Sequence, residues 1–549
     1  MARRIDPWLL GILLISFGLS TYHLDWGLPN GNESWAADAL GPVTVLGILH
    51  HSFSAWNSGW FYFKYPMGYP LLLAVSFAPY LGYLFVAGAW KHPSTAYPFG
   101  FAHPEHALFV LALIGRLISV LCAVGTVALT YLIGRRLFDR WTGRLAALLA
   151  ATAYPIVYYA HTTNLDGSYL FWLTLALYCA IAASETERWL PWVTLGIAAA
   201  MAVSTKEQGF AFLLPLPVLA LAARVRAQRS LRVLWGAPVW WMAGAAIGTV
   251  VLANNVAYNP LGFVARIAFL LGRPLHPINA RLAPVEFAWF KGVHEWVYLS
   301  QLWDGMDSAL GTPLACLAAA GAVALWRTPR QAVWLVVPVV VHYYLSLRGL
   351  DLITLRYLLP FYVVGALLAA ALLTRLYRGT GTPMGRRVIA ALAVLLVALG
   401  LARAIELDWT LRTDARYQAE AWLAANVPAR GRAEVYQKPV YMPRFPSGVD
   451  VNVVPMSERS IRGLQRRRPD VIVLSSASRQ SVSHVWAQDW KANGALLAPV
   501  PEAVELVRGI ETDRVGYRRV GVFRQQPWLL RSRLTSICPE ITIYARHDQ

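Results

Sequence analysis

Long apolar runs recur along the chain from the N-terminus to about residue 405, and they approach the roughly 20 residues that a helix needs to cross a bilayer. Of the 549 residues, 57% are hydrophobic and only 14% are charged. This composition excludes an ordinary soluble domain and predicts a polytopic α-helical membrane protein. We expect about 11–13 transmembrane helices at this helix length.

Arginine clusters between the apolar runs predict which side of the membrane each connector faces. Cationic connectors are retained in the cytoplasm, so we place four of them there. The first apolar run, 8–20, follows Arg3 and Arg4, which predicts a retained first helix with a cytoplasmic N-terminus. Because each cluster is a short connector between apolar runs, we expect no nucleic-acid partner. The clusters lie at 134–144, 223–232, 326–330 and 375–387.

The apolar character ends near residue 405, and the chain that follows is polar. It contains an amphipathic stretch, RYQAEAWLAANV, and short β-like runs such as DVIVLSS. We therefore expect a transmembrane domain over 1–405 and a small soluble α/β domain over 406–549, which an odd number of crossings places outside the cytoplasm. Residues 66–89 are apolar enough to span but would break this parity, so we expect re-entrant, interfacial or hairpin helices there.

The same topology turns the stretch NGNESWAADAL, 30–40, outward with two carboxylates, Glu33 and Asp38. On a helix they would point about 140° apart, so only one would face a given site. A carboxylate at the outer edge of the bilayer, beside Trp26 and Trp35, can act as a general base toward a hydroxyl or an amine. The alternative is an ordinary loop acid or a helix N-cap.

A second outward stretch, AHTTNLDGSYLFW, places His161, Asn164 and Asp166 where one apolar helix ends and the next begins. Polar groups at membrane depth are expensive and are therefore candidates for function. We expect the three side chains to form the hydrogen-bonding rim of a pocket. The alternative is that Asp166 caps the second helix.

Three cations lie on the predicted outer side, against the positive-inside trend: Lys64, Lys206 and Arg356. Together they favour an anionic lipid ligand whose phosphate they could pair with. Snorkelling of long side chains at helix ends is the alternative. In the stretch STKEQGF, Ser204 and Glu207 also fit a capping box.

No cofactor motif stands out in the sequence. Phosphate-binding glycine loops and the GxSxG motif of serine hydrolases do not occur in a suitable context. We therefore expect a reaction that needs no cofactor, with a divalent metal as the alternative. The histidines that suggest a metal lack the spacing of a known site; they are His50, His51, His92, His103 and His106.

Five stretches, in this order, resemble the membrane glycosyltransferases of the GT-C class. Within that class the chain is similar to the protein O-mannosyltransferase group and its bacterial relatives, which include the lipid A aminoarabinose transferase (glycosyltransferase family 39). The resemblance covers roughly residues 8–405. Its stretches are GLPNGNESWAADAL, KYPMGYPLLL, HTTNLDGSYLFW, TKEQGFAFLLP and LRYLLPFYVVGALLAA.

The resemblance implies an enzyme that transfers a sugar, with mannose the family-weighted choice, from a polyprenyl-phosphate donor to a protein, glycan or lipid acceptor outside the membrane, with inversion. In the family a carboxylate of the first outer loop is the base, usually within an Asp-Glu pair. Here Asn32 and Glu33 stand where that pair is expected. The distance to the closing Tyr65 favours Asp38 as the base, with Glu33 second.

The remaining site residues follow from the same resemblance. Asp166 would orient the site or hold the acceptor, and Lys64, Lys206 and Arg356 would contact the phosphate. An inverting transfer needs these two roles, because a base activates the acceptor while negative charge grows on the departing phosphate. The lipid carrier would lie against apolar helix faces among membrane lipids. The other expected substrate-binding residues are Tyr65, His161, Asn164 and Glu207.

Two alternatives belong to other classes of protein. A lipid transporter or flippase predicts ionisable groups at mid-helix and paired repeats, whereas here these groups cluster at outer helix ends. A catalytically silent scaffold, whose soluble domain binds a partner, is kept open by the altered Asn32-Glu33 pair.

Overall fold

The computed structural model describes residues 6–28, 35–36, 39–54, 66–271, 295–325, 328–348, 350, 353–476, 501–530 and 537–547. The chain divides into two compact units. The first consists of Met1–Leu24 and Asp38–Ile405, and the second of Asp25–Ala37 and Glu406–Gln549. A short segment of the first predicted outer loop thus belongs to the C-terminal unit.

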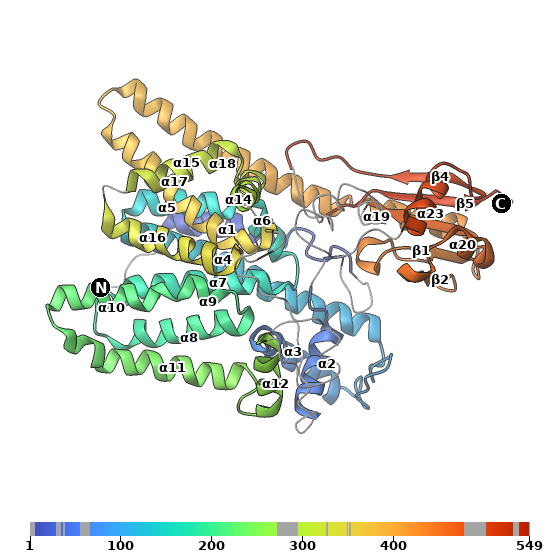
Figure 1. Ribbon diagram of the computed structural model, residues 1–549, viewed down its shortest axis with the longest axis horizontal. Coiled ribbons are helices and arrows are strands. Elements are labelled where there is room, and N and C mark those ends of the chain that lie inside the picture. The colour runs from blue at the N-terminus through green and yellow to red at the C-terminus, as the bar shows by residue number, and fades with distance from the viewer. Residues whose placement is uncertain are drawn as a thin grey trace. The chain divides into compact units, whose positions relative to one another are not determined.

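The described secondary structure of the first unit is helical, apart from an isolated bridge between Trp90 and Phe101 (Figure 1). Its elements are α1 (Pro7–Thr21), α2 (Pro42–Ser54), α3 (Gly68–Val86), α4 (Pro104–Leu137), α5 (Arg140–Ala151), α6 (Tyr154–Ala160), α7 (Leu165–Ala183), α8 (Trp189–Thr205), α9 (Gly209–Leu213), α10 (Pro215–Gln228), η1 (Leu231–Trp235), α11 (Ala237–Ala253), α12 (Pro260–Leu270), α14 (Glu295–Leu310), α15 (Thr312–Ala324), α16 (Pro329–His342), η3 (Tyr343–Leu347), η4 (Leu355–Leu358), α17 (Leu359–Gly379) and α18 (Pro383–Arg412).

The helices confirm a multi-pass membrane protein. Within the described residues, seven are long and apolar enough to cross a membrane, or eight if the bent pair α14 and α15 forms one span. The predicted first helix is present as α1, but α1 and α8 have only 15 and 17 residues. Among the described residues, these two short apolar helices account for part of the difference from the 11–13 expected.

Close helix packing in the first unit depends on small residues. Helices α4, α7, α8 and α11 contact one another in that order, and in Figure 1 α8 and α11 run side by side. A Cβ on Gly196 of α8 would lie 2.3 Å from the Met242 carbonyl oxygen of α11. At the contact of α4 with α5, a Cβ on Gly134 would lie 2.8 Å from the Cα of Gly143. Glycine lets both pairs of backbones approach, as is common in membrane helices.

The segment 66–89 forms one helix, α3, of 19 residues rather than a helical hairpin. By length and composition α3 is among the helices that could cross a membrane. Its start packs tightly against the end of α8, because a Cβ on Gly68 would lie 2.6 Å from the Ser204 carbonyl oxygen. The hairpin alternative for this segment is therefore wrong.

The start of α1 is held by a buried ion pair. Asp6 caps α1, accepting a hydrogen bond from the Trp8 backbone N–H at 3.2 Å. Its carboxylate also accepts two hydrogen bonds from Arg144 of α5, at 2.7 and 3.0 Å, and one from the Tyr131 hydroxyl at 2.8 Å. The Arg144 guanidinium lies 4.8 Å from the centre of the Trp141 ring. These contacts join α1, α4 and α5 at one point.

This pair makes stability depend on pH. The hydrogen-bonded Arg144 guanidinium lowers the pKa of Asp6 from 3.8 to about 2. The ionised carboxylate therefore stabilises the fold above about pH 4, and that contribution is lost as the pH falls toward 2. Asp6→Asn keeps a helix-capping side chain but removes the charge. We expect it to lower the free energy of unfolding by roughly 1.5–3 kcal/mol at pH 7, the range for a hydrogen bond to a charged group.

The measurement is the melting temperature of the detergent-solubilised protein at pH 7 and at pH 3. The difference in melting temperature between the wild type and Asp6→Asn should be smaller at pH 3 than at pH 7. Asp513→Asn is the control, because its carboxylate pairs with His547 at the surface of the other unit. An equal gap at both pH values would contradict the assignment.

The second unit contains a five-stranded mixed sheet in the order β2-β1-β3-β5-β4. Strand β1 pairs in parallel with β2 and β3, while β5 pairs antiparallel with β3 and β4. The elements are α19 (Ala415–Asn426), β1 (Arg432–Val435), η5 (Pro439–Tyr441), β2 (Asp450–Val453), η6 (Met456–Glu458), α20 (Ile461–Arg467), β3 (Val471–Ser475), α23 (Pro501–Glu511), β4 (Tyr517–Phe523) and β5 (Ile541–Arg546).

Both faces of this sheet are covered, which explains why its central strand is apolar at every position. Val471 and Val473 of β3 pack with Leu423 of α19 on one face. Ile472 and Leu474 pack on the other face, in the cluster that includes residues of α20 and α23. A strand buried on both sides reads as a continuous apolar run rather than an alternating one. The strand and the amphipathic helix predicted from sequence are confirmed as β3 and α19.

Candidate functional site

A buried ion pair joins two of the sequence stretches singled out above. The Lys206 Nζ lies 2.6 Å from the Asp166 Oδ1, and the two side chains are 8% and 2% exposed. Asp166 lies in the first turn of α7, and Lys206 is the C-cap of α8. Burying both charges is expensive unless they stay paired, so this contact fixes the end of α8 against the start of α7.

Lys206 and Arg356 converge on one aromatic ring. The Lys206 Nζ lies 4.5 Å from the centre of the Tyr357 ring, and the Arg356 guanidinium carbon lies 5.0 Å from the same centre. The Arg356 Nη2 also donates to the Tyr357 hydroxyl at 3.2 Å. The Tyr169 ring of α7 lies 5.6 Å from the Lys206 Nζ. Three predicted site residues, Asp166, Lys206 and Arg356, are thus brought together around Tyr357.

Asn164, rather than Asp166, caps α7. The Asn164 Oδ1 accepts a hydrogen bond from the Asp166 backbone N–H at 3.1 Å. The alternative that Asp166 serves as the N-cap is therefore wrong. Because Asn164 takes that role, the Asp166 carboxylate is directed to Lys206 instead.

His161 holds the chain that leaves α1. Its Nδ1 lies 2.9 Å from the Val157 carbonyl oxygen and its Nε2 lies 2.7 Å from the Tyr22 carbonyl oxygen. Beside it, the Arg116 Nη1 donates to the Leu24 carbonyl oxygen at 2.5 Å. Both ring nitrogens of His161 contact backbone, so the imidazole ties the residues that follow α1 to the end of α6.

Glu207 pairs with Arg266 of α12, whose side chain is 9% exposed. The predicted capping box is not formed, because Lys206 ends α8 and Gln208 is the N-cap of α9. Ser204 instead lies in the last turn of α8, where its Oγ accepts from the Asn254 side-chain amide at 2.5 Å. Glu207 therefore ties the α8–α9 junction to α12.

Four predicted site residues lie outside the described part of the chain: Glu33, Asp38, Lys64 and Tyr65. One described neighbour, Leu40, contacts the stretch that leads into α7. The Leu40 backbone N–H donates to the Thr163 carbonyl oxygen at 3.2 Å, between His161 and Asn164.

Sequence reasoning missed Tyr357, Tyr169 and Arg266. Arg266 carried a usable signal, because it is a lone cation in the predicted outer stretch LGFVARIAFL, as Lys206 is in its own stretch. The tyrosines carried none, since the chain has 25 of them.

An apolar cavity of about 350 Å³ lies among α14, α15, α16 and α17. From α14 it is lined by Trp303 and Met306, and from α17 by Phe361, Gly365 and Leu368. Phe361 follows Arg356 by five residues, or about 8 Å along a helix axis. The same stretch of chain therefore carries a cation at one end and apolar cavity wall at the other. Within the described residues, no three His, Cys, Asp or Glu side chains could together hold a metal ion.

The segment that holds most of this site matches a known family. Residues 109–258 match the family described as Dolichyl-phosphate-mannose-protein mannosyltransferase. This range includes His161, Asn164, Asp166, Lys206 and Glu207. No curated protein matches the chain in sequence. The match confirms the predicted resemblance to GT-C membrane glycosyltransferases of the family 39 kind. The matched segment makes up less than half of the chain.

Three solved structures resemble the chain at low identity. The oligosaccharyltransferase of Archaeoglobus fulgidus is 12% identical, over 95% of this chain and 72% of that one, with a TM-score of 0.47. ArnT from Cupriavidus metallidurans, bound to undecaprenyl phosphate, is 13% identical over 98% and 97%, with a TM-score of 0.44. The S. cerevisiae Pmt1-Pmt2 protein O-mannosyltransferase complex, bound to the sugar donor, is 15% identical over 48% and 34%, with a TM-score of 0.32.

Proposed function

We propose that the chain transfers a sugar, with mannose as the first candidate, from a polyprenyl-phosphate donor to an acceptor on the extracytoplasmic side of the membrane, with inversion at the sugar. The observation that carries the proposal is the arrangement around η4 and α17. Lys206 and Arg356 meet at Tyr357, and the next turns of α17 line the apolar cavity. A cation five residues before an apolar cavity wall on the same stretch of chain suits a ligand with an anionic head and a hydrocarbon tail.

The charge of each site residue indicates the step of the reaction in which it would act. Negative charge grows on the phosphate as the sugar departs, and a cation placed there stabilises the transition state more than the ground state. Arg356 is half-buried beside Tyr357, and in our proposal it contacts that phosphate. Lys206 is paired with Asp166. In our proposal its ammonium group contacts both the Asp166 carboxylate and the donor phosphate once the donor is bound.

The acceptor must lose a proton as it attacks, which requires a base on the opposite side of the sugar. We assign this base to Asp38, with Glu33 as the second candidate. The backbone N–H of Leu40, two residues after Asp38, donates a hydrogen bond to the carbonyl oxygen of Thr163, which lies three residues before Asp166. This contact supports a base close to the ion pair. The acceptor is a protein, a glycan or a lipid, and the proposed topology keeps the N-terminus in the cytoplasm and the C-terminal unit outside.

The test uses the full-length protein in lipid nanodiscs with a panel of radiolabelled polyprenyl-phosphate sugars, starting with mannose. The wild type should consume at least one donor and release polyprenyl phosphate. Arg356→Gln should lower donor consumption by at least about tenfold, the effect of losing a charge-assisted contact of about 1.4 kcal/mol or more. Arg330→Gln is the matched control, because the Arg330 side chain is 79% exposed. If no donor in the panel is bound or consumed, the proposal is wrong.

A further inference from the structure

Three large apolar side chains of the C-terminal unit are exposed. Trp528 and Leu529, in the connection between β4 and β5, are 93% and 42% exposed. Trp409, in the last turn of α18, is 54% exposed, and the Arg412 guanidinium carbon lies 5.8 Å from the centre of its ring. Single exposed apolar residues are common on proteins, but a group of them that the fold brings together marks a site of interaction.

Glu406 of α18 holds the connection that carries Trp528. Its carboxylate accepts hydrogen bonds from three consecutive backbone N–H groups, those of Trp528, Leu529 and Leu530. The contacts to Leu529 and Leu530 are 2.8 and 2.6 Å long. Hydrogen bonds to an ionised carboxylate are stronger than those between neutral groups. Leu530 is buried, so the connection packs on one side while Trp528 and Leu529 stay exposed beside the turn that contains Glu406.

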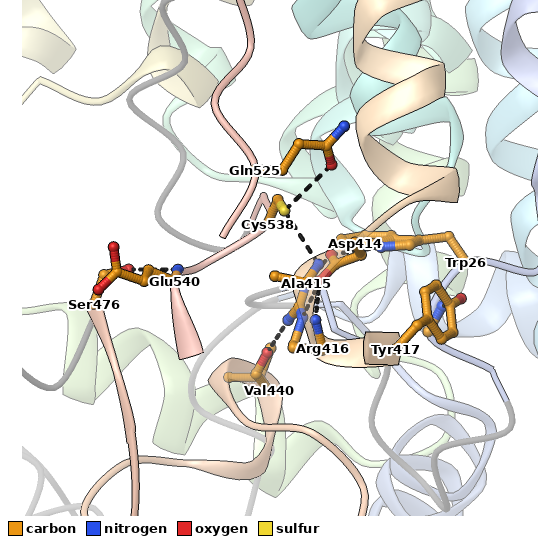
Figure 2. Close-up of polar contacts among 11 residues, drawn as sticks. Trp26, Asp414, Ala415, Arg416, Tyr417, Val440, Ser476, Gln525, Cys538 and Glu540 are labelled. Carbon is orange, nitrogen blue, oxygen red and sulfur yellow. Dashed lines mark hydrogen bonds and ion pairs between the residues drawn. The ribbon is translucent and has the colours of Figure 1, made fainter. Parts of the chain in front are cut away.

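The two ends of the same connection are fixed to the start of α19. The Ala415 backbone N–H donates to the Cys538 Sγ at 3.3 Å, and the Cys538 thiol donates to the Gln525 side-chain oxygen at 3.6 Å. Figure 2 shows Cys538 between Gln525 and Ala415. Gln525 lies two residues after β4 ends, and Cys538 lies three residues before β5 begins. These contacts lie within the C-terminal unit, and they place the connection at the corner where α18 leads into α19.

The length of α18 places this corner at the edge of a bilayer. It is one continuous helix and is among the helices long and apolar enough to cross a membrane. Its apolar run begins at Val388, and a bilayer core about 30 Å thick takes about 20 helical residues, so the span ends near Leu407. Arg403 lies about one turn inside this end, where a long cationic side chain still reaches the headgroups. Glu406 and Trp409 therefore lie at the level of the lipid headgroups.

We propose that Trp409, Trp528 and Leu529 form an interfacial anchor, through which the C-terminal unit contacts the lipid headgroups of the membrane that α18 crosses. Tryptophan is enriched at this level because its ring is apolar while its indole N–H finds polar partners. The occupant is a bilayer rather than a protein, because the anchor continues the exposed apolar surface of α18, to which Leu399 and Ile405 belong. This contact is independent of the sugar transfer proposed above.

The test replaces one residue at a time with the photoreactive p-benzoylphenylalanine in the full-length protein, embedded in phospholipid nanodiscs. After illumination, mass spectrometry identifies the peptides that carry an attached phospholipid. Replacement of Trp409 or Trp528 should give a lipid adduct, as should replacement of Leu395, the positive control, which is exposed in the span of α18. Val453 is the matched negative control, because it is exposed but lies on β2, at the opposite edge of the sheet from β4.

Glu406→Ala tests how the anchor is held. Without the carboxylate, the lipid adduct at position 528 should fall about tenfold or more, because losing hydrogen bonds to a charged group shifts an equilibrium by at least that factor. The adduct at position 409 should remain, since that residue is part of α18 itself. Glu505→Ala is the control, because Glu505 is an exposed carboxylate on α23 of the same unit.

Two results would overturn the anchor. One is the absence of a lipid adduct at position 528 in nanodiscs where position 395 is labelled. The other is an equal yield at positions 528 and 453, because labelling would then not depend on the level of the bilayer. An adduct at position 528 that Glu406→Ala leaves unchanged would overturn the role of Glu406.

Discussion

Replacing Asp38 with asparagine is expected to lower kcat for sugar transfer by about 10²–10⁴-fold, the usual contribution of a general base. Asparagine has nearly the same shape as aspartate but cannot accept the acceptor's proton at neutral pH. Donor binding should remain, because the cations that we propose for the phosphate are unchanged. Glu33→Gln should have a smaller effect if Asp38 is the base, and the larger effect if the roles are reversed.

The assay measures kcat and donor affinity separately for Asp38→Asn, Glu33→Gln and the pair together. Glu105→Gln is the control, since Glu105 is an exposed carboxylate in the first turn of α4. The wild-type rate should fall at low pH as the base is protonated, and this fall should disappear in the variant that has lost the base. If both single variants and the double variant turn over at the wild-type rate, neither Asp38 nor Glu33 is the catalytic base.

The polar residues of the site were predictable from sequence, but their pairing was not. Asp166 and Lys206 each stood out as an ionisable group at the end of an apolar run, which is rare and therefore informative. They lie 40 residues apart, and nothing local specifies that α7 and α8 bring them together. The sequence predicted that Lys206 contacts a phosphate. In the structure its ammonium group is paired with the Asp166 carboxylate.

The role of the segment Asp25–Ala37 could not be read from sequence for a similar reason. Its composition fits an outer loop, and the domain boundary at 405 followed from the loss of apolar runs. The contact between Trp26 and Asp414 joins residues 388 positions apart, and it depends on burial that only the folded chain creates. Local patterns served better in the C-terminal unit, where the apolar run of β3 specified a strand buried on both faces.

Helix ends were predicted least well, because several residues in each stretch could serve as caps. In TNLD both Asn164 and Asp166 are good N-cap residues, and a shift of two positions decides whether the Asp166 carboxylate is used as a cap or remains for the site. In STKEQ the capping-box spacing was present, but Ser204 lies in the last turn of α8, and Gln208 rather than Ser204 is the N-cap of the next helix, α9. In the folded chain Asp166 pairs with Lys206, so Asp166 does not cap α7 and Lys206 ends α8.

The second large effect concerns that pair. Removing one partner of a buried ion pair leaves the other charge without compensation, which typically lowers stability by about 3–5 kcal/mol. We therefore expect Lys206→Met and Asp166→Asn each to lower the melting temperature clearly, with Lys206→Met the more severe because it also removes the cation beside Tyr357. The double variant should be more stable than the sum of the two losses predicts, since neither charge then remains.

Donor affinity distinguishes a structural pair from one that also serves the phosphate. If Lys206 shares the donor's phosphate, Asp166→Asn removes the competing negative charge and should tighten donor binding severalfold, while Lys206→Met should weaken it. A structural pair would instead leave the donor Kd of both folded variants near that of the wild type. Opposite shifts from the two partners of a single ion pair cannot come from unfolding, because both variants lose stability. Titration of the nanodisc-embedded variants with polyprenyl-phosphate sugar therefore tests whether the charge of Lys206 acts on the donor.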